Sequence, residues 1–209
     1  TGERIARILV THAHLDHSPL ARPLAEATGA RVYAFGGATA GRSEITQALA
    51  AQGLAGGGEG VDRAFAPDVV LEDGEPLDLG DGREIVALWT PGHFSSHLCF
   101  ALDGVVFTGD HVMGWASTLI SPPDGDLTAF LASCAKLAER TDRVFLPALG
   151  DAVEDPAARL AWLVEHRRAR ERQILAALTP GPANIPSLVR AIYTDTDPRL
   201  LPAAERNVF

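Results

Sequence analysis

The sequence predicts a mixed fold of α-helices and β-strands, with one large domain and a small helical appendage. Short apolar runs, many rich in valine, isoleucine and leucine, alternate with longer segments whose apolar residues recur at the helical period. Turn and cap signals separate these segments. The chain has 209 residues, of which 46% are hydrophobic and 22% are charged. This composition is ordinary for a globular protein, and the length suffices to bury one sizeable core.

The first half of the chain carries signals for two strands, two helices and a glycine-rich loop. Pro19 suits the first position of a helix, with Ser18 as its N-cap and Gly29 as its stop signal. Five glycines between residues 53 and 60 predict a loop, and a plain linker is favoured over a lid. The expected strands are 5–11 and 31–35, and the expected helices are 19–27 and 43–51.

The second half is predicted to contain hairpins followed by helices. Asp81-Gly82 and Asp103-Gly104 each lie between apolar runs, which is a hairpin signal. Asp155-Pro156 predicts the start of a long helix. The character of the chain changes after residues 179–182, where one short helix is expected. The expected strands are 84–90, 98–102, 105–108 and 144–146, and the expected helices are 126–140, 156–178 and 185–192.

The run His12-Ala13-His14-Leu15-Asp16-His17 follows the first predicted strand. Imidazole and carboxylate are the groups that bind Zn²⁺ and related divalent metals. In an extended segment His12 and His14 point to the same side, whereas Asp16 and His17 fall in the following turn. One short segment can therefore present ligands to two adjacent metal positions. The alternative is a histidine-rich surface loop without a metal.

This run resembles the signature of the metallo-β-lactamase superfamily. Thr90-Pro91-Gly92-His93 and Thr108-Gly109-Asp110 are similar to the next two motifs of that family, in the same order. The resemblance extends over about residues 5–150 and implies a four-layer αβ/βα sandwich with one or two metals at the sheet edges. The family places several strands and a helix before its first motif, so we expect part of that half to be missing from this sequence.

The resemblance also divides the chain and narrows its branch. It implies a catalytic domain over residues 1–179 and the start of a winged-helix-like appendage over residues 180–209. Residues 109–114 and 166–175 are similar to a lactamase-B-like branch that includes a single-strand endoribonuclease and lies near glyoxalase-II-like hydrolases.

Roles for the motif residues follow from the resemblance. It implies that His12, His14 and His93 bind a first zinc ion, that Asp16 and His17 bind a second, and that Asp110 bridges the two. Asp16 is the expected catalytic residue, because it would orient the metal-activated water and accept its proton. His97, four residues after His93, is interpreted as a supporting residue rather than a ligand.

One position departs from the family pattern. The family expects a further histidine in the segment that matches Leu146-Pro147-Ala148-Leu149-Gly150, and Leu149 stands in its place. Because leucine cannot coordinate a metal, the second zinc site is in doubt. A mononuclear enzyme, a weakened second site and an impaired variant all remain open. His111 and His166 are candidate substitutes.

These observations favour a zinc-dependent hydrolase acting on an ester, thioester or lactone. One alternative is an endonuclease for single-stranded RNA, because Arg167, Arg168, Arg170 and Arg172 could form a basic face, although a solvated helix face is the favoured interpretation. The formal net charge of −9 argues against a broad phosphate-binding surface. The other alternative is a degenerate, non-catalytic metal-binding domain.

Partners and compartment are only broadly constrained. A small-molecule substrate is favoured over RNA, no membrane contact is expected, and a homodimer remains open. The two cysteines, Cys99 and Cys134, lie in apolar segments and are expected to be buried thiols, which suits the cytoplasm.

Overall fold

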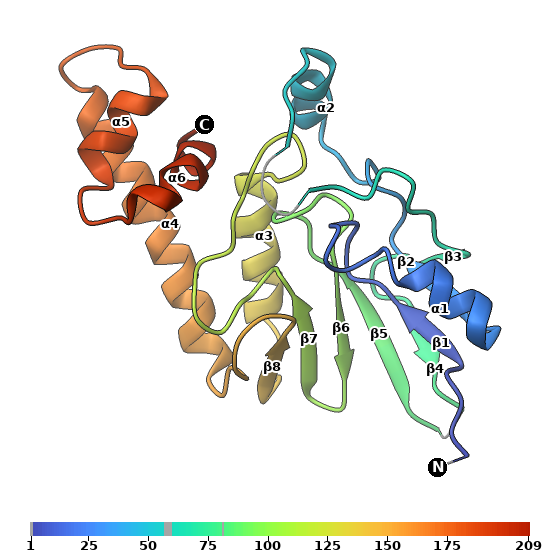
Figure 1. Ribbon diagram of the computed structural model, residues 1–209. Coiled ribbons are helices and arrows are strands. Elements are labelled where there is room, and N and C mark those ends of the chain that lie inside the picture. The colour runs from blue at the N-terminus through green and yellow to red at the C-terminus, as the bar shows by residue number, and fades with distance from the viewer. Residues whose placement is uncertain (1, 57–59, 81) are drawn as a thin grey trace.

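The computed structural model describes residues 2–56, 60–80 and 82–209, which form two β-sheets flanked by helices (Figure 1). The three-stranded sheet contains β1 (Arg7–Leu9), β2 (Arg31–Ala34) and β3 (Val69–Val70). The five-stranded sheet contains β4 (Pro76–Asp78), β5 (Glu84–Trp89), β6 (Leu98–Leu102), β7 (Val105–Gly109) and β8 (Val144–Pro147). The helical elements are α1 (Ala21–Thr28), α2 (Glu44–Ala51), α3 (Leu127–Ala138), α4 (Pro156–Leu178), α5 (Ile185–Ile192), the 3₁₀ turn η1 (Pro198–Leu200) and α6 (Leu201–Val208).

The connections explain how the strands pair. β1 and β2 are parallel and α1 lies between them in sequence, and β3 pairs in parallel with β2. In the second sheet β4 to β7 are antiparallel, and α3 provides the crossover that lets β8 pair in parallel with β7. Asp103 and Gly104 both have positive φ, as a type I′ hairpin turn between β6 and β7 requires. The Asp81 half of the other hairpin signal lies outside the described residues.

Three apolar clusters fill the spaces between successive layers. Ile85, Leu98 and Phe100 belong to the cluster between the two sheets, where Leu9 and Tyr33 of the smaller sheet meet them. The other two clusters lie on the outer faces of the two sheets. The cluster against α1 includes Val10, Ala21, Ala25, Val32 and Phe94, and the cluster under α3 and α4 includes Val106, Phe130, Cys134, Phe145 and Leu163. The result is helix, sheet, sheet, helix, which confirms the predicted four-layer sandwich.

Side-chain caps set the start of most helices. Ser43, Asp126, Asp155 and Asn184 each accept a hydrogen bond from the backbone N–H three residues later. Each such cap stabilises its helix by about 1 kcal/mol. The predicted helix start at Pro19 is wrong, since α1 begins at Ala21.

The reason lies in the tertiary structure around Ser18. Its hydroxyl lies in the turn after the histidine run, where it donates to the carbonyl of His14 or to Asp62. This turn continues past Ser18, so Leu20 stands at the N-cap position and α1 has no side-chain cap. Gly29 ends the helix in the left-handed conformation, as predicted.

The C-terminal segment is helical and packs on the far end of α4. α4 runs beside the sandwich and then extends beyond it, and α5 and α6 pack together at that end (Figure 1). Residues 180–209 contain helical elements and no strand. The winged-helix-like appendage therefore stays a prediction. The glycine-rich loop expected at 53–60 lies partly outside the described residues, which omit 57–59. Within the described chain, no helix combines the length and the apolar character that a membrane crossing needs.

Candidate metal centre

Three separate segments bring the predicted site residues together. The chain leaves β1 at Leu9 and continues through His12 to His14, which forms an isolated bridge with Val61. His93 follows the end of β5, and Asp110 directly follows β7. Because strands of both sheets end here, residues far apart in sequence meet at one edge of the sandwich.

Three imidazoles converge in the first part of the centre. His12 Nε2 lies 2.9 Å from His14 Nδ1, and His93 Nε2 lies 3.1 Å from the same atom. All three side chains are buried. Two nitrogen ligands of a tetrahedral zinc ion at about 2.0–2.1 Å would lie about 3.3 Å apart, so the observed spacing fits a shared cation. Burial lowers the pKa of His12 and His14, which favours the neutral form that binds metals.

A second group lies against the first and contains His12, His17 and Asp110. Asp110 Oδ2 lies 3.3 Å from His17 Nε2 and 3.9 Å from His93 Nε2, so this oxygen stands between the two parts of the centre. Burial would raise the pKa of Asp110, but the hydrogen bond and charge of His17, with His93 and His14, lower it below its usual value.

The other oxygen of Asp110 tests whether a cation fits. Oδ1 is buried and has no hydrogen-bond partner among the described residues. Leaving a buried polar group unsatisfied costs about 1–3 kcal/mol, and more when the group is charged. A cation beside this carboxylate would remove that cost. The donor set and its spacing therefore fit a divalent metal.

Asp16 lies on the open side of the centre. Its side chain is 40% exposed, and its Oδ2 is 3.4 Å from His17 Nε2. Neither compact ligand group includes Asp16. The structure thus brings His12, His14, His17, His93 and Asp110 together and places Asp16 at their rim.

The segment 118–120 holds His93 and Asp110 from behind. His93 Nδ1 donates to the carbonyl of Leu119 at 2.7 Å, which leaves Nε2 as the lone-pair nitrogen facing the cluster. Thr118 Oγ1 donates to the carbonyl of Asp110 at 2.5 Å and lies 3.1 Å from His93 Nδ1. Sequence reasoning missed both residues, because no local motif marks a loop that meets the site only after folding.

His97 supports the centre without joining either ligand group. Its Nε2 accepts the backbone N–H of Asp110 at 3.3 Å, so its Nδ1 carries the proton and donates to Thr90 Oγ1 at 3.1 Å. Gly109 has a φ of +50°, and a Cβ there would lie 2.7 Å from His97 Nε2. Only glycine fits this close approach.

The two candidate substitute ligands lie elsewhere. His111 is fully buried against α3, with its ring 4.7 Å from that of Phe130 and Nε2 3.8 Å from Cys134 Sγ. Burial lowers its pKa to about 3. His166 stacks on Trp162 on α4. Neither residue belongs to a potential ligand group within the described chain.

Leu149 follows β8 and is 41% exposed. The N–H of Ala148 donates to the carbonyl of Gly109 at 3.0 Å, so the segment leading to Leu149 runs beside the residue before Asp110. The second part of the centre contains His17 and Asp110, and it shares His12 with the first.

The arginines of α4 do not form one basic face. Arg167 is buried, Arg170 lies over the ring of Tyr193 at 3.9 Å, and Arg172 pairs with Glu165. Arg168 is exposed. The favoured interpretation of a solvated face therefore holds for part of the cluster, and the buried Arg167 departs from it.

Comparison with known proteins gives the family. Residues 1–149 match the Metallo-beta-lactamase superfamily, so the chain belongs to that superfamily. The chain is similar to the solved structure of a metallo-beta-lactamase family protein from Thermus thermophilus, with a TM-score of 0.75 and 26% sequence identity. The alignment covers 98% of this chain and 72% of the Thermus chain.

Curated relatives point in the same direction. The chain is 28% identical to the Beta-lactamase-like protein 2 homolog of Drosophila melanogaster, over 98% of this chain and 66% of that protein. It is also 28% identical to an Atrochrysone carboxyl ACP thioesterase of Aspergillus fumigatus, over 84% of this chain and 48% of that protein. The chain thus spans about half to two thirds of the length of these relatives.

Proposed function

We propose that this chain is a metal-dependent hydrolase that uses zinc. His12, His14 and His93 hold the principal ion, and His17, Asp110 and Asp16 form a weaker second position. One observation carries the proposal. Three buried imidazole nitrogens converge beside a buried carboxylate oxygen that has no hydrogen-bond partner among the described residues.

The residues of the centre have different roles in the proposed reaction. When bound, zinc lowers the pKa of its water to about 7 and polarises the substrate's carbonyl oxygen. Asp16, at the open side, orients the attacking water and accepts its proton. Asp110, fixed through its carbonyl by Thr118 and through its N–H by His97, keeps its carboxylate between His17 and His93. Burial lowers the pKa of His12 and His14 and so favours their neutral, metal-binding form.

An ester or thioester is the favoured substrate class. The similar Aspergillus fumigatus protein is named as a thioesterase, and the net charge of −9 disfavours a polyanionic substrate. Cleavage of single-stranded RNA is the alternative. A degenerate domain is the third candidate because Leu149 weakens the second metal position.

The test compares histidine variants on model substrates. His14→Ala removes a buried ligand, and His166→Ala removes a histidine that stacks on Trp162, away from either ligand group. We expect His14→Ala to lose at least about 100-fold in kcat/KM on an acyl thioester, and His166→Ala to stay within about threefold of the wild type. Equal activity of His14→Ala and wild type would contradict the proposal. Cleavage of single-stranded RNA without thioester hydrolysis would move the assignment to the alternative.

A further inference from the structure

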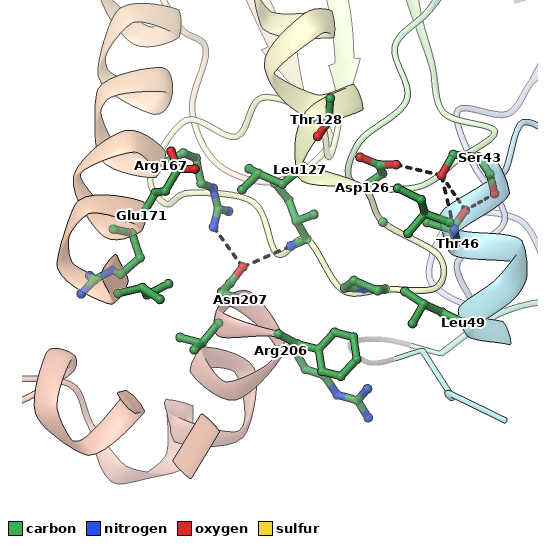
Figure 2. A pocket seen from close by; sticks show the side chains of 18 of the residues that line it. Ser43, Thr46, Leu49, Asp126, Leu127, Thr128, Arg167, Glu171, Arg206 and Asn207 are labelled. Carbon is green, nitrogen blue, oxygen red and sulfur yellow. Dashed lines mark hydrogen bonds between the residues drawn. The ribbon is translucent and has the colours of Figure 1, made fainter. Parts of the chain in front are cut away.

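A second cavity lies between the sandwich and the C-terminal helices. Its volume is about 580 Å³, within the range of small-molecule sites. Figure 2 shows Leu49 of α2, Leu127 at the start of α3 and Arg206 of α6 around it. Its apolar wall includes Ile45, Leu49, Leu127, Ile174, Leu175 and Val208.

The apolar wall is open at its rim. Ile45 is 72% exposed, Leu175 is 62% exposed and Leu127 is 38% exposed. These three come from α2, α4 and α3, and they face one cavity rather than being scattered over the surface. A concentrated apolar rim of this kind marks a binding site more often than chance exposure does.

Three guanidinium groups line the same cavity. Arg167, Arg170 and Arg206 make no ion pair with a carboxylate in the described part of the chain. Arg206 donates to the carbonyl of Ala55, which does not line the cavity, and Arg167 is 6% exposed. Two carboxylates, Asp126 and Glu171, also line it, and Asp126 is occupied by Ser43 and the cap of α3. Cations therefore outnumber acids here, in a chain whose net charge is −9.

The cavity is connected to the metal centre through the segment 118–126. Asn207 accepts from Arg167 at 3.0 Å and from the N–H of Ile120 at 3.4 Å (Figure 2). Arg167 also donates to the carbonyl of Thr118. The hydroxyl of Thr118 in turn donates a hydrogen bond to the carbonyl of Asp110, and the carbonyl of Leu119 accepts one from His93. A ligand in the cavity would thus touch the back of the segment that positions two predicted metal ligands.

From this arrangement we infer that the cavity binds an amphipathic carboxylate, such as a medium-chain fatty acid, at a site separate from the metal centre. The apolar wall takes the chain, and Arg206 at the rim pairs with the carboxylate. The inference does not rest on the proposed hydrolase function, because no residue that lines the cavity belongs to either potential ligand group. Arg206 has no carboxylate partner in the described part of the chain, so an anionic ligand is preferred over a neutral one.

The first test measures binding without turnover. Octanoate is titrated calorimetrically into wild type and into His14→Ala, and 1-octanol serves as the uncharged probe of equal length. We expect octanoate to bind both proteins equally, which separates the cavity from metal coordination and from hydrolysis. Failure of the thioester assay with retained octanoate binding would overturn only the proposed function.

Two pairs of variants locate the site. Leu175→Asp places a charge on the exposed rim, and its control Leu20→Asp makes the same change at an exposed leucine just before α1 that does not line the cavity. Arg206→Gln is matched by Arg172→Gln. We expect Leu175→Asp to weaken octanoate binding by about tenfold or more, and Arg206→Gln to weaken octanoate by about threefold or more while leaving 1-octanol unchanged.

Three results would overturn the inference. The first is that wild type does not bind octanoate. The second is that the test and control variants lose octanoate affinity equally. The third is that the wild type is a dimer, that Leu175→Asp dissociates it, and that octanoate does not change the dimer. The last result would mean that a second copy covers the apolar rim.

Discussion

Replacing Thr118 by valine should weaken metal binding without touching a metal ligand. Thr118 is 1% exposed, and its hydroxyl donates to the carbonyl of Asp110 at 2.5 Å and lies 3.1 Å from His93 Nδ1. Valine keeps the shape of threonine and removes the hydroxyl. The variant therefore leaves the carbonyl of Asp110 without its donor in a buried place.

The size of the effect follows from these contacts. An unsatisfied buried acceptor costs about 1–3 kcal/mol, so the free energy of unfolding should fall by that amount. Residues that orient metal ligands typically change metal affinity by about 10–100-fold. Because His93 keeps its bond to the carbonyl of Leu119, we expect the lower end, about tenfold, which corresponds to about 1.4 kcal/mol.

Competition with a chelator of known affinity measures the metal dissociation constant, and urea unfolding of the metal-free protein measures stability. Thr141→Val is the control, because Thr141 is an exposed threonine at the other end of α3. Metal affinity in Thr118→Val equal to that of wild type would refute the argument that the 118–120 segment positions the ligands. A loss of stability alone would show a purely structural role.

Three further predictions concern the same centre. Gly109→Ala should lower the free energy of unfolding by about 1–2 kcal/mol through its positive φ alone. The overlap of the new Cβ with His97 should also reduce the metal content. Urea unfolding measures the first effect and elemental analysis the second, and unchanged values would contradict the prediction. In the metal-free protein, burial lowers the pKa of His12, His97 and His111 in the folded state, so the unfolded chain binds more protons below about pH 6.5. Stability should therefore be complete above pH 6.5 and fall as the pH drops below it, by up to about 4 kcal/mol per pH unit for three histidines; equal stability at pH 7.5 and pH 5.5 would be inconsistent with buried neutral imidazoles. Leu149→His should raise metal occupancy toward two ions per chain, and unchanged occupancy would show that Leu149 does not mark a lost ligand.

Local signals in the sequence were enough to place most elements. The helices at 156–178 and 185–192 begin and end where predicted, because Asp155 and Asn184 cap them and a proline follows within two residues. The start of α1 was mispredicted, since the turn after the histidine run continues past Ser18, whose hydroxyl donates to Asp62, a residue 44 positions away. Local rules cannot anticipate such a competing tertiary partner.

The candidate site shows the same division between local and distant information. The run from His12 to His17 is contiguous, so its chemistry is legible in sequence. Thr118, Leu119 and Arg167 act on the centre from distant segments and carry no motif. The second cavity joins α2, α4 and α6, and no periodicity within one helix reveals a wall built from three.

Elemental analysis of the protein purified without added metal tests the central claim most directly. Zinc and iron are both measured, because imidazole and carboxylate ligands accept either. The account predicts at least about one ion per chain, predominantly zinc, in wild type and in His166→Ala, and almost none in His14→Ala. A wild type without metal, or a His14→Ala variant that keeps its metal, would contradict a centre built on His12, His14 and His93.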